Sequence, residues 1–342
     1  MTSDGLGSIV GDPQWLAHRY DPQRDAFHFV DVPRAAQSRA TFLTDKELPP
    51  EPTLRAIGRG DALARRPDTA PLHYIFHSAF CCSTLLARAL DRPGLAMALK
   101  EPVVLNDLVG WRRRGGKDAD VAAVLDATLT LLARPFAPGE SIVVKPSNIV
   151  ACVGNAMLSM RPASRALLLY TPLRAYIGSI AKKGLWGRLW VRDLFVGLQQ
   201  DRLIDLGFAP EDYIKLTDLQ IAAVGWLAQH VLFARMLDRH GPARVRSLDS
   251  EAMLARPEAA LHALFALFGW SDRDHLVAEI LAGGEFARHA KSDLPFGLAD
   301  RAIEQREAEQ AHADEIAKVV AWAETVAARA GVSLELAHAL LP

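Results

Sequence analysis

A short run of small and polar residues is the part of this chain best suited to bind a phosphate. It lies between an apolar run at 72–76 and an apolar stretch with helical spacing at 83–90. Its members are Ser78, Ala79, Phe80, Cys81, Cys82, Ser83 and Thr84. A loop that leads into a helix points several backbone N–H groups at one place, where the helix dipole also favours negative charge. The run therefore predicts a phosphate-binding loop, and the alternative is a strand-to-helix turn in which Ser83 and Thr84 serve only as helix caps.

Three titratable residues end or follow predicted strands, where the loops of an open parallel sheet line the ligand crevice. Glu101 is the preferred general base and His77 is the alternative base. Lys145 could supply a cation for a developing negative charge. The competing interpretations are an exposed pair between Glu101 and Lys100, a His77 that only packs, and a Lys145 that extends its ammonium into solvent.

The cysteines offer a further alternative. Cys81 and Cys82 lie where a helix N-terminus lowers the pKa of a thiol, so a cysteine nucleophile or redox sensor has to be considered. No oriented His and Asp or Asn partner is evident in the sequence. With Cys152 as the remaining cysteine, neither a disulfide framework nor a zinc site is expected.

The elements that must position these residues alternate between short apolar runs and helical patterns. Strands are expected at 72–76, 96–99, 141–144, 166–170 and 243–248, and helices at 83–90, 121–133, from about 174, at 257–268 and at 302–330. The stretch 180–237 is largely helical and holds Trp186, Trp190 and Trp226, which we expect in the core. Strands that alternate with helices indicate a parallel sheet covered on both faces. The sequence therefore predicts an α/β fold, a three-layer sandwich with a central parallel sheet, in a domain over 71–342.

Residues 1–70 differ from the rest because Pro-containing pairs and the Pro49–Pro52 cluster interrupt short apolar stretches. They predict a loop-rich N-terminal segment with one or two strands that packs on the main domain. No residue in this segment is singled out for chemistry.

Composition bounds the class of protein. Half of the 342 residues are hydrophobic, which excludes a disordered or fibrous protein, and 39 Lys and Arg against 40 Asp and Glu argue against a dedicated nucleic-acid partner. No signal peptide and no stretch apolar enough to span a bilayer are evident. The expectation is a cytoplasmic protein with no membrane partner, and the last helix could provide contacts for a homodimer.

The order of the segments resembles the sulfotransferase family. Its members carry, after the first strand, a loop of the form Pro-Lys/Arg-Ser-Gly-Thr/Ser-Thr-Leu-Leu, and the run Ser83–Leu86 matches its end. Later segments that resemble the family are Leu99–Pro102, Val143–Ser147, Leu168–Ser179 and Arg246–Trp270. This chain has Phe80 where the family loop has Lys or Arg, Cys82 where it has Gly, and Tyr170 in place of a later Arg.

The resemblance implies a P-loop NTPase-like sulfotransferase fold of the bacterial type. The loop over Ala79–Leu86 would hold the 5′-phosphosulfate of the donor 3′-phosphoadenosine-5′-phosphosulfate (PAPS), with Arg174 and Ser179 on its 3′-phosphate. Glu101 would be the catalytic base, as it can be in members that share this segment. The family usually needs no metal, so none is expected, and residues 288–291 could close over the nucleotide.

The predicted function is transfer of a sulfuryl group from PAPS to a hydroxyl or amine of a small-molecule acceptor. One alternative is a P-loop kinase-like enzyme. The absence of a lysine before Thr84 argues against this alternative. The other is a non-catalytic nucleotide-binding protein that kept the fold and lost the loop cation.

Overall fold

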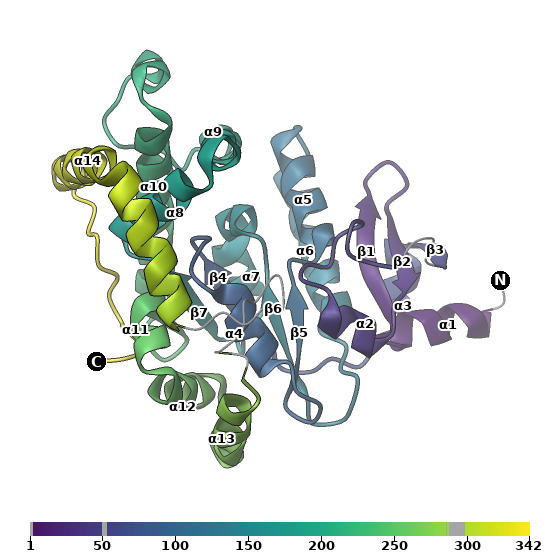
Figure 1. Cartoon of the computed structure of the whole chain (residues 1–342). Coiled ribbons are helices and arrows are strands. Elements are labelled where there is room, and N and C mark those ends of the chain that lie inside the picture. The colour runs from purple at the N-terminus through teal and green to yellow at the C-terminus, as the bar shows by residue number, and fades with distance from the viewer. Residues whose placement is uncertain (1–2, 50–52, 285, 287–297) are drawn as a thin grey trace. The chain divides into compact units, whose positions relative to one another are not determined.

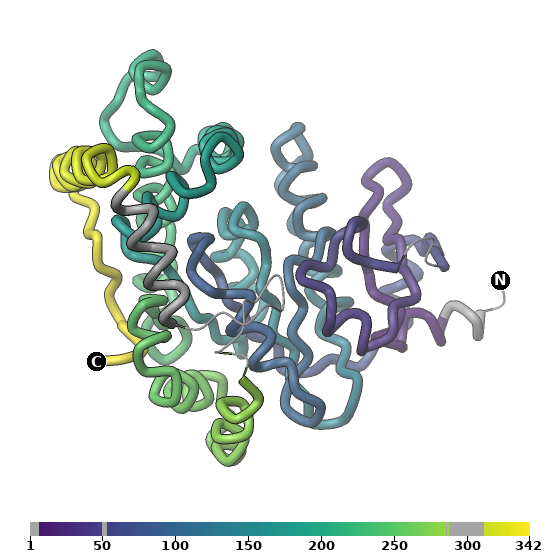
Figure 2. Tube along the Cα trace, viewed as in Figure 1, coloured from purple at the N-terminus to yellow at the C-terminus, as the bar shows by residue number. Residues whose placement is uncertain are grey.

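The computed structural model describes residues 3–49, 53–284, 286 and 298–342 (Figure 1). The chain divides into two compact units. The first comprises 1–76 and 84–166, and the second comprises 77–83 and 167–342. The trace in Figure 2 follows this course from purple at the N-terminus to yellow at the C-terminus.

A five-stranded parallel sheet with flanking helices confirms the predicted three-layer α/β sandwich. The strand order is β5-β6-β4-β7-β8. The strands are β4 (Leu72–His77), β5 (Ala96–Lys100), β6 (Ser141–Lys145), β7 (Ala166–Tyr170) and β8 (Val245–Asp249). Every residue of β4, β5 and β6 is buried, as in parallel sheets whose two faces are both covered.

Helices and short 3-10 turns make up most of the rest of the described chain. In the first part of the chain they are α1 (Ser3–Gly11), α2 (Arg34–Arg39), α3 (Arg59–Ala64), α4 (Ser83–Leu90), α5 (Val103–Arg113), α6 (Asp118–Leu132), η1 (Asn148–Val153) and α7 (Gly154–Met160). After β7 they are α8 (Leu173–Lys182), α9 (Gly184–Gln200), η2 (Pro210–Lys215), α10 (Asp218–His240), α11 (Ser250–Ala255), α12 (Pro257–Phe268), η3 (Ser271–Arg273), α13 (His275–Ala282) and α14 (Leu298–Ala330). Pro257 opens α12 and Gly269 ends it with a left-handed φ of 81°, which only glycine adopts without strain.

Residues 15–58 contain a three-stranded antiparallel sheet, where the sequence predicted one or two strands. Its members are β1 (Trp15–Asp21), β2 (Ala26–Asp31) and β3 (Leu54–Gly58), in the order β1-β2-β3. The sequence predicted no bounds for these strands. The first three residues of β3 are exposed, so this strand lacks the alternation of buried and exposed positions that marks a half-buried strand.

A buried guanidinium joins the N-terminal segment to the rest of the first unit. Arg134 donates to the carbonyl oxygens of Val10, Asp12, Trp15 and Leu131 at 2.6–3.0 Å, and to that of Ile9 at 3.4 Å. These include the last carbonyls of α1, which a cation stabilises. Burial lowers the pKa of Arg134 to about 10, so the group is still charged at neutral pH.

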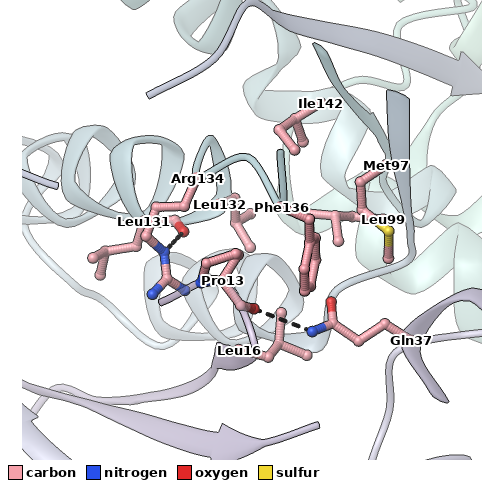
Figure 3. Close-up of a pocket in the computed structure, with 10 residues that line it drawn as sticks. All are labelled: Pro13, Leu16, Gln37, Met97, Leu99, Leu131, Leu132, Arg134, Phe136 and Ile142. Carbon is pink, nitrogen blue, oxygen red and sulfur yellow. Dashed lines mark hydrogen bonds between the residues drawn. The ribbon is translucent and has the colours of Figure 1, made fainter. Parts of the chain in front are cut away.

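A small, mostly apolar cavity lies beside this guanidinium (Figure 3). Residues of the N-terminal segment, of β5 and β6 and of the end of α6 line it, among them Leu16, Leu99 and Ile142. The side-chain amide of Gln37 reaches the carbonyl of Pro13 across one side, and Arg134 reaches that of Leu131 across the other. The cavity therefore marks where the antiparallel sheet packs against the first unit's part of the parallel sheet.

The second unit has a core of its own, built mainly from α8, α9, α10 and α14. The C-terminal residues 338–340 cover the edge of β8. The N–H of Ser247 donates to the carbonyl of His338, and the carbonyl of Ser247 accepts from the N–H of Leu340. An edge strand covered in this way has no open hydrogen-bonding groups to offer another chain at that place. Among the described residues, no helix has both the length and the apolar character needed to cross a bilayer.

His230 is a buried titratable group in this second core, with 1% of its surface exposed. Its ring stacks on Trp226 with the centroids 3.4 Å apart and meets Tyr170 edge-on at 5.1 Å. Burial lowers the pKa of His230 to about 3, so the side chain is neutral in the folded protein at every mild pH.

We expect this histidine to weaken the protein in acid. The unfolded chain binds a proton at His230 below about pH 6.5 and the folded chain does not, so the free energy of unfolding falls as the pH drops. From pH 6.5 to 5 the loss is about 2 kcal/mol, at roughly 1.4 kcal/mol per pH unit. Urea unfolding at pH 7 and pH 5 measures it, and His230→Phe should lose about 2 kcal/mol less than the wild type between these two pH values. Burial also lowers the pKa of His73 to about 4, so the variant still loses some stability in acid because of His73. An equal loss of unfolding free energy in both proteins would contradict the prediction.

Candidate functional site

The predicted phosphate loop lies between the end of β4 at His77 and the start of α4 at Ser83, as expected. Its backbone is unusual because Ala79, Phe80 and Cys82 have φ values of 69°, 52° and 60°. Residues other than glycine rarely adopt this left-handed backbone conformation, which costs about 1–3 kcal/mol for each residue. Such strain is found most often at functional sites. Three strained residues within four positions distinguish this loop from an ordinary strand-to-helix turn.

Hydrogen bonds tie the loop to the end of β7. Ser78 donates its N–H to the carbonyl of Leu169 at 3.1 Å, and the Thr171 N–H donates back to the Ser78 hydroxyl at 3.1 Å. The Thr171 hydroxyl in turn donates to the carbonyl of Phe80 at 3.0 Å. These bonds hold the strained backbone in place. Without them the loop would relax to a conformation of lower energy.

His77 has a defined role at the start of the loop. Its Nδ1 accepts the N–H of Ala79 at 3.1 Å, and 5% of the residue is exposed. A ring nitrogen that accepts a hydrogen bond carries no proton, so in this arrangement the ring proton lies on Nε2. His77 is therefore a residue that shapes the loop, whatever further part it plays.

Phe80 stands where the sulfotransferase loop has Lys or Arg, so this loop has an aromatic ring at that position. Phe80 packs edge-on against Tyr176 of α8, with centroids 6.0 Å apart, and against Trp190 of α9 at 5.4 Å. Of the hydroxyl residues that follow, Ser83 and Thr84 are both buried. Cys81 is buried and Cys82 is half-buried, and neither of these two residues forms a disulfide.

Glu101 and Lys145 form an ion pair at the ends of two neighbouring strands, β5 and β6. The register of these parallel strands places Lys100 opposite Lys145, and the N–H of Glu101 donates to the carbonyl of Lys145 at 2.7 Å. Glu101 itself has a left-handed φ of 51°. The Lys145 side chain is 1% exposed and that of Glu101 is 19% exposed, so the lysine is covered while its carboxylate partner reaches the surface.

This geometry corrects two of the competing interpretations. Glu101 does not pair with Lys100, because successive side chains of a strand point to opposite faces. Lys100 is buried and donates to the carbonyls of Gln37 and Ser38, with Asp91 3.6 Å away. Nor does Lys145 extend into solvent. Burial also lowers the pKa of Lys100 and raises that of Asp91.

The N-terminal segment supplies a residue that the sequence analysis missed. The Lys145 ammonium lies 5.0 Å from the centre of the Phe42 ring, a cation–π distance. Leu43 fixes this segment beside β5, donating to the carbonyl of Lys100 at 2.7 Å and accepting from Val103 at 3.1 Å. No local pattern points to Phe42, because it is separated from Lys145 by more than 100 positions of the chain.

The residues predicted for the 3′-phosphate lie on α8. Arg174 is exposed in its first turn, and the Ser179 hydroxyl donates to the carbonyl of Ala175 at 2.9 Å. Contact between Phe80 and Tyr176 brings this helix against the loop within the second unit. Ser179 keeps its oxygen lone pairs as acceptors, but its proton is already engaged. The predicted closing segment, 288–291, lies outside the described residues.

Comparison with known proteins adds no assignment: no model of a protein family matches the chain, and no curated protein sequence matches it.

Proposed function

We propose that this protein is a sulfotransferase that moves a sulfuryl group from PAPS to a hydroxyl or amine of a small molecule. The observation that carries the proposal is the strained loop between β4 and α4, whose left-handed residues are held by bonds from the end of β7. Strain of this kind persists where a backbone has to present its N–H groups in a fixed direction.

In this proposal the loop binds the 5′-phosphosulfate of the donor. Backbone N–H groups at the start of α4, its helix dipole and the hydroxyls of Ser83 and Thr84 provide donors for phosphate oxygens. Arg174 is suited to the 3′-phosphate because an exposed guanidinium can bind a phosphate through two parallel hydrogen bonds. Ser179 would bind the same phosphate only after its hydroxyl gives up the bond to the carbonyl of Ala175.

Glu101 and Lys145 are assigned the chemical step. The acceptor oxygen or nitrogen attacks sulfur in line, and its proton passes to the Glu101 carboxylate. The bond between sulfur and the bridging phosphate oxygen breaks, and its electron pair leaves with 3′-phosphoadenosine-5′-phosphate. Lys145 would stabilise the negative charge on that oxygen. The loop itself has no cation for this role, because Phe80 stands where the sulfotransferase loop has Lys or Arg. Both the loop and this pair follow strands of one parallel sheet, in which ligands bind outside the carboxyl ends of the strands.

Binding of the desulfated donor tests the proposal directly. We expect isothermal titration to show that 3′-phosphoadenosine-5′-phosphate binds and that ATP does not, because ATP lacks the 3′-phosphate to which Arg174 is assigned. Tighter binding of ATP would favour a kinase-like enzyme instead. Binding of the desulfated donor without turnover of radiolabelled PAPS would favour a non-catalytic nucleotide-binding protein.

Thr84→Ala should weaken binding of the desulfated donor by about 1–3 kcal/mol, since a charged phosphate oxygen loses its donor. Because Thr84 is buried, the change should also lower the stability of the unliganded protein by roughly 1 kcal/mol. Thermal melting without ligand separates the two effects. Thr325→Ala, on α14, is a matched control because the Thr325 hydroxyl donates within its own helix, to Ala321. Unchanged affinity of the Thr84 variant would place the phosphate elsewhere.

A further inference from the structure

Helix α9 exposes apolar side chains that the fold of the second unit does not use. Among the described residues, Leu185, Trp186, Leu189 and Val196 of this helix are 72, 60, 55 and 51% exposed. Large apolar side chains exposed elsewhere in the described chain are Leu54 and Ile214. A cluster of this kind on one helix marks an interaction surface, whereas single exposed apolar residues are ordinary.

The opposite face of α9 already satisfies the packing needs of the helix. Val191, Leu194, Phe195 and Leu198 are buried there, and Phe195 packs against Tyr213 at 5.1 Å. A helix that is apolar on both sides is normally enclosed on both sides, yet α9 is covered on one only. Its exposed apolar residues begin with Leu185, directly after the turn that joins it to α8 (Figure 1).

The end of α8 and the first half of α9 contain cations and no carboxylate of their own. No Asp or Glu occurs from Thr171 to Arg192, a stretch that contains five Lys and Arg residues. Lys182 and Lys183 are exposed directly before Leu185 and Trp186. Arg188 pairs with Glu315 and Arg192 pairs with Asp218. Lys182 and Lys183 are the last two cations before Leu185 in the chain.

The other end of the exposed cluster differs in charge. Asp193 precedes Val196, and the exposed Ile214 belongs to the turn η2. This turn contains Glu211, Asp212 and one cation, Lys215, which pairs with Asp212. These carboxylates would be repelled by an anionic surface. The first half of α9 therefore combines apolar side chains with cations and without acidic residues, and the second half does not.

We propose that Lys182, Lys183, Leu185, Trp186 and Leu189 form a docking face for the surface of an anionic lipid bilayer. The leucines would enter the boundary between headgroups and acyl chains, and the indole would lie at headgroup depth, where its ring finds both apolar and polar neighbours. The lysines would bind the anionic headgroups. Such a helix lies on a bilayer and needs no membrane span, so it differs from the mode of membrane contact that the sequence excluded. The inference does not depend on sulfuryl transfer.

Vesicle sedimentation with the full chain tests the docking face. We expect binding to vesicles of phosphatidylcholine with 30% phosphatidylserine in about 0.1 M NaCl, and weaker binding in about 0.5 M NaCl, where charges are more strongly screened. Lys182→Gln with Lys183→Gln should lower the partition coefficient roughly 30-fold, from about 1 kcal/mol per lysine. Leu185→Gln with Leu189→Gln should lower it at least about 10-fold. Ile214→Gln is the matched control, since Ile214 is 83% exposed in the same unit but beside carboxylates, and it should bind as the wild type does.

A fluorescence measurement on the wild type avoids any doubt about folding of the variants. Brominated acyl chains in the same vesicles should quench tryptophan emission, and Trp186→Phe should remove most of that quenching. Absence of vesicle binding by the wild type, or equal loss in the Ile214 variant, would overturn the proposal. It would also be overturned if light scattering showed a dimer that the double leucine variant converts to a monomer while vesicles bind neither protein, because the face would then be an interface between two copies.

Discussion

Glu101→Gln is expected to lower the rate of sulfuryl transfer by about 10²–10⁴-fold, the usual contribution of a positioned general base. The amide keeps the shape of the carboxylate and can still accept a hydrogen bond from Lys145, but it cannot take the acceptor proton. Binding of 3′-phosphoadenosine-5′-phosphate should therefore stay close to that of the wild type. Single-turnover rates with radiolabelled PAPS, together with titration of the desulfated donor, measure the two effects separately.

Two further variants decide what the result means. Glu258→Gln, at an exposed position in the first turn of α12, should keep full activity. His77→Gln tests the alternative base, although loss of the bond between His77 and Ala79 should also weaken donor binding. If Glu101→Gln keeps full activity while His77→Gln abolishes it, the base is His77. If both variants turn over at the wild-type rate, the proposed chemical step is wrong.

Arg134→Ala is expected to cost roughly 3–5 kcal/mol of folding stability, because several buried carbonyls lose their donor at about 1–3 kcal/mol each. The change leaves the carbonyls of Val10, Asp12 and Trp15 without the donor that the structure gives them, and it leaves a cavity where the guanidinium packs over the Phe29 ring. Urea unfolding measures the loss.

Arg55→Ala is the control for this effect because the Arg55 guanidinium is exposed and donates to the neighbouring carbonyl of Leu54. We expect it to change stability by no more than about 0.5 kcal/mol. Arg134→Lys should recover only part of the loss, since an ammonium offers fewer donors than the guanidinium fork. A stability close to that of the wild type in Arg134→Ala would show that the N-terminal segment is held mainly by its apolar contacts.

Local patterns in the sequence determined most of the secondary structure. The buried strands β4 to β7 were predicted within one or two residues, because each is a short apolar run bounded by turn or helix signals. The bounds of α12 followed from Pro257 and Gly269. The bounds of the strand β3 were not predicted, because an edge strand with an exposed start has no periodic pattern.

The composition of the loop over Ser78–Thr84 marked it as a candidate for phosphate binding. The left-handed backbone at Ala79, Phe80 and Cys82 had no counterpart in the sequence, since glycine is the residue that usually signals such angles. The bonds that hold this conformation come from Thr171, which directly follows β7 and lies more than 80 residues later in the chain. Backbone strain is thus a property of the assembled sheet, and the local sequence of the loop does not encode it.

Tertiary structure alone decided the partners of the charged residues. The alternation of side chains along a strand already favoured opposite directions for Lys100 and Glu101 over a pair between them. Only the folded chain shows that Glu101 pairs with Lys145 and that Lys100 lies near Asp91. The same holds for tryptophans in apolar helices, because Trp226 is buried and Trp186 is exposed although both were expected in the core. The sequence determines which residues prefer burial or charge pairing, through their side-chain chemistry. Which preference each residue satisfies depends on the neighbours that the folded chain brings to it, and those neighbours come from distant parts of the sequence.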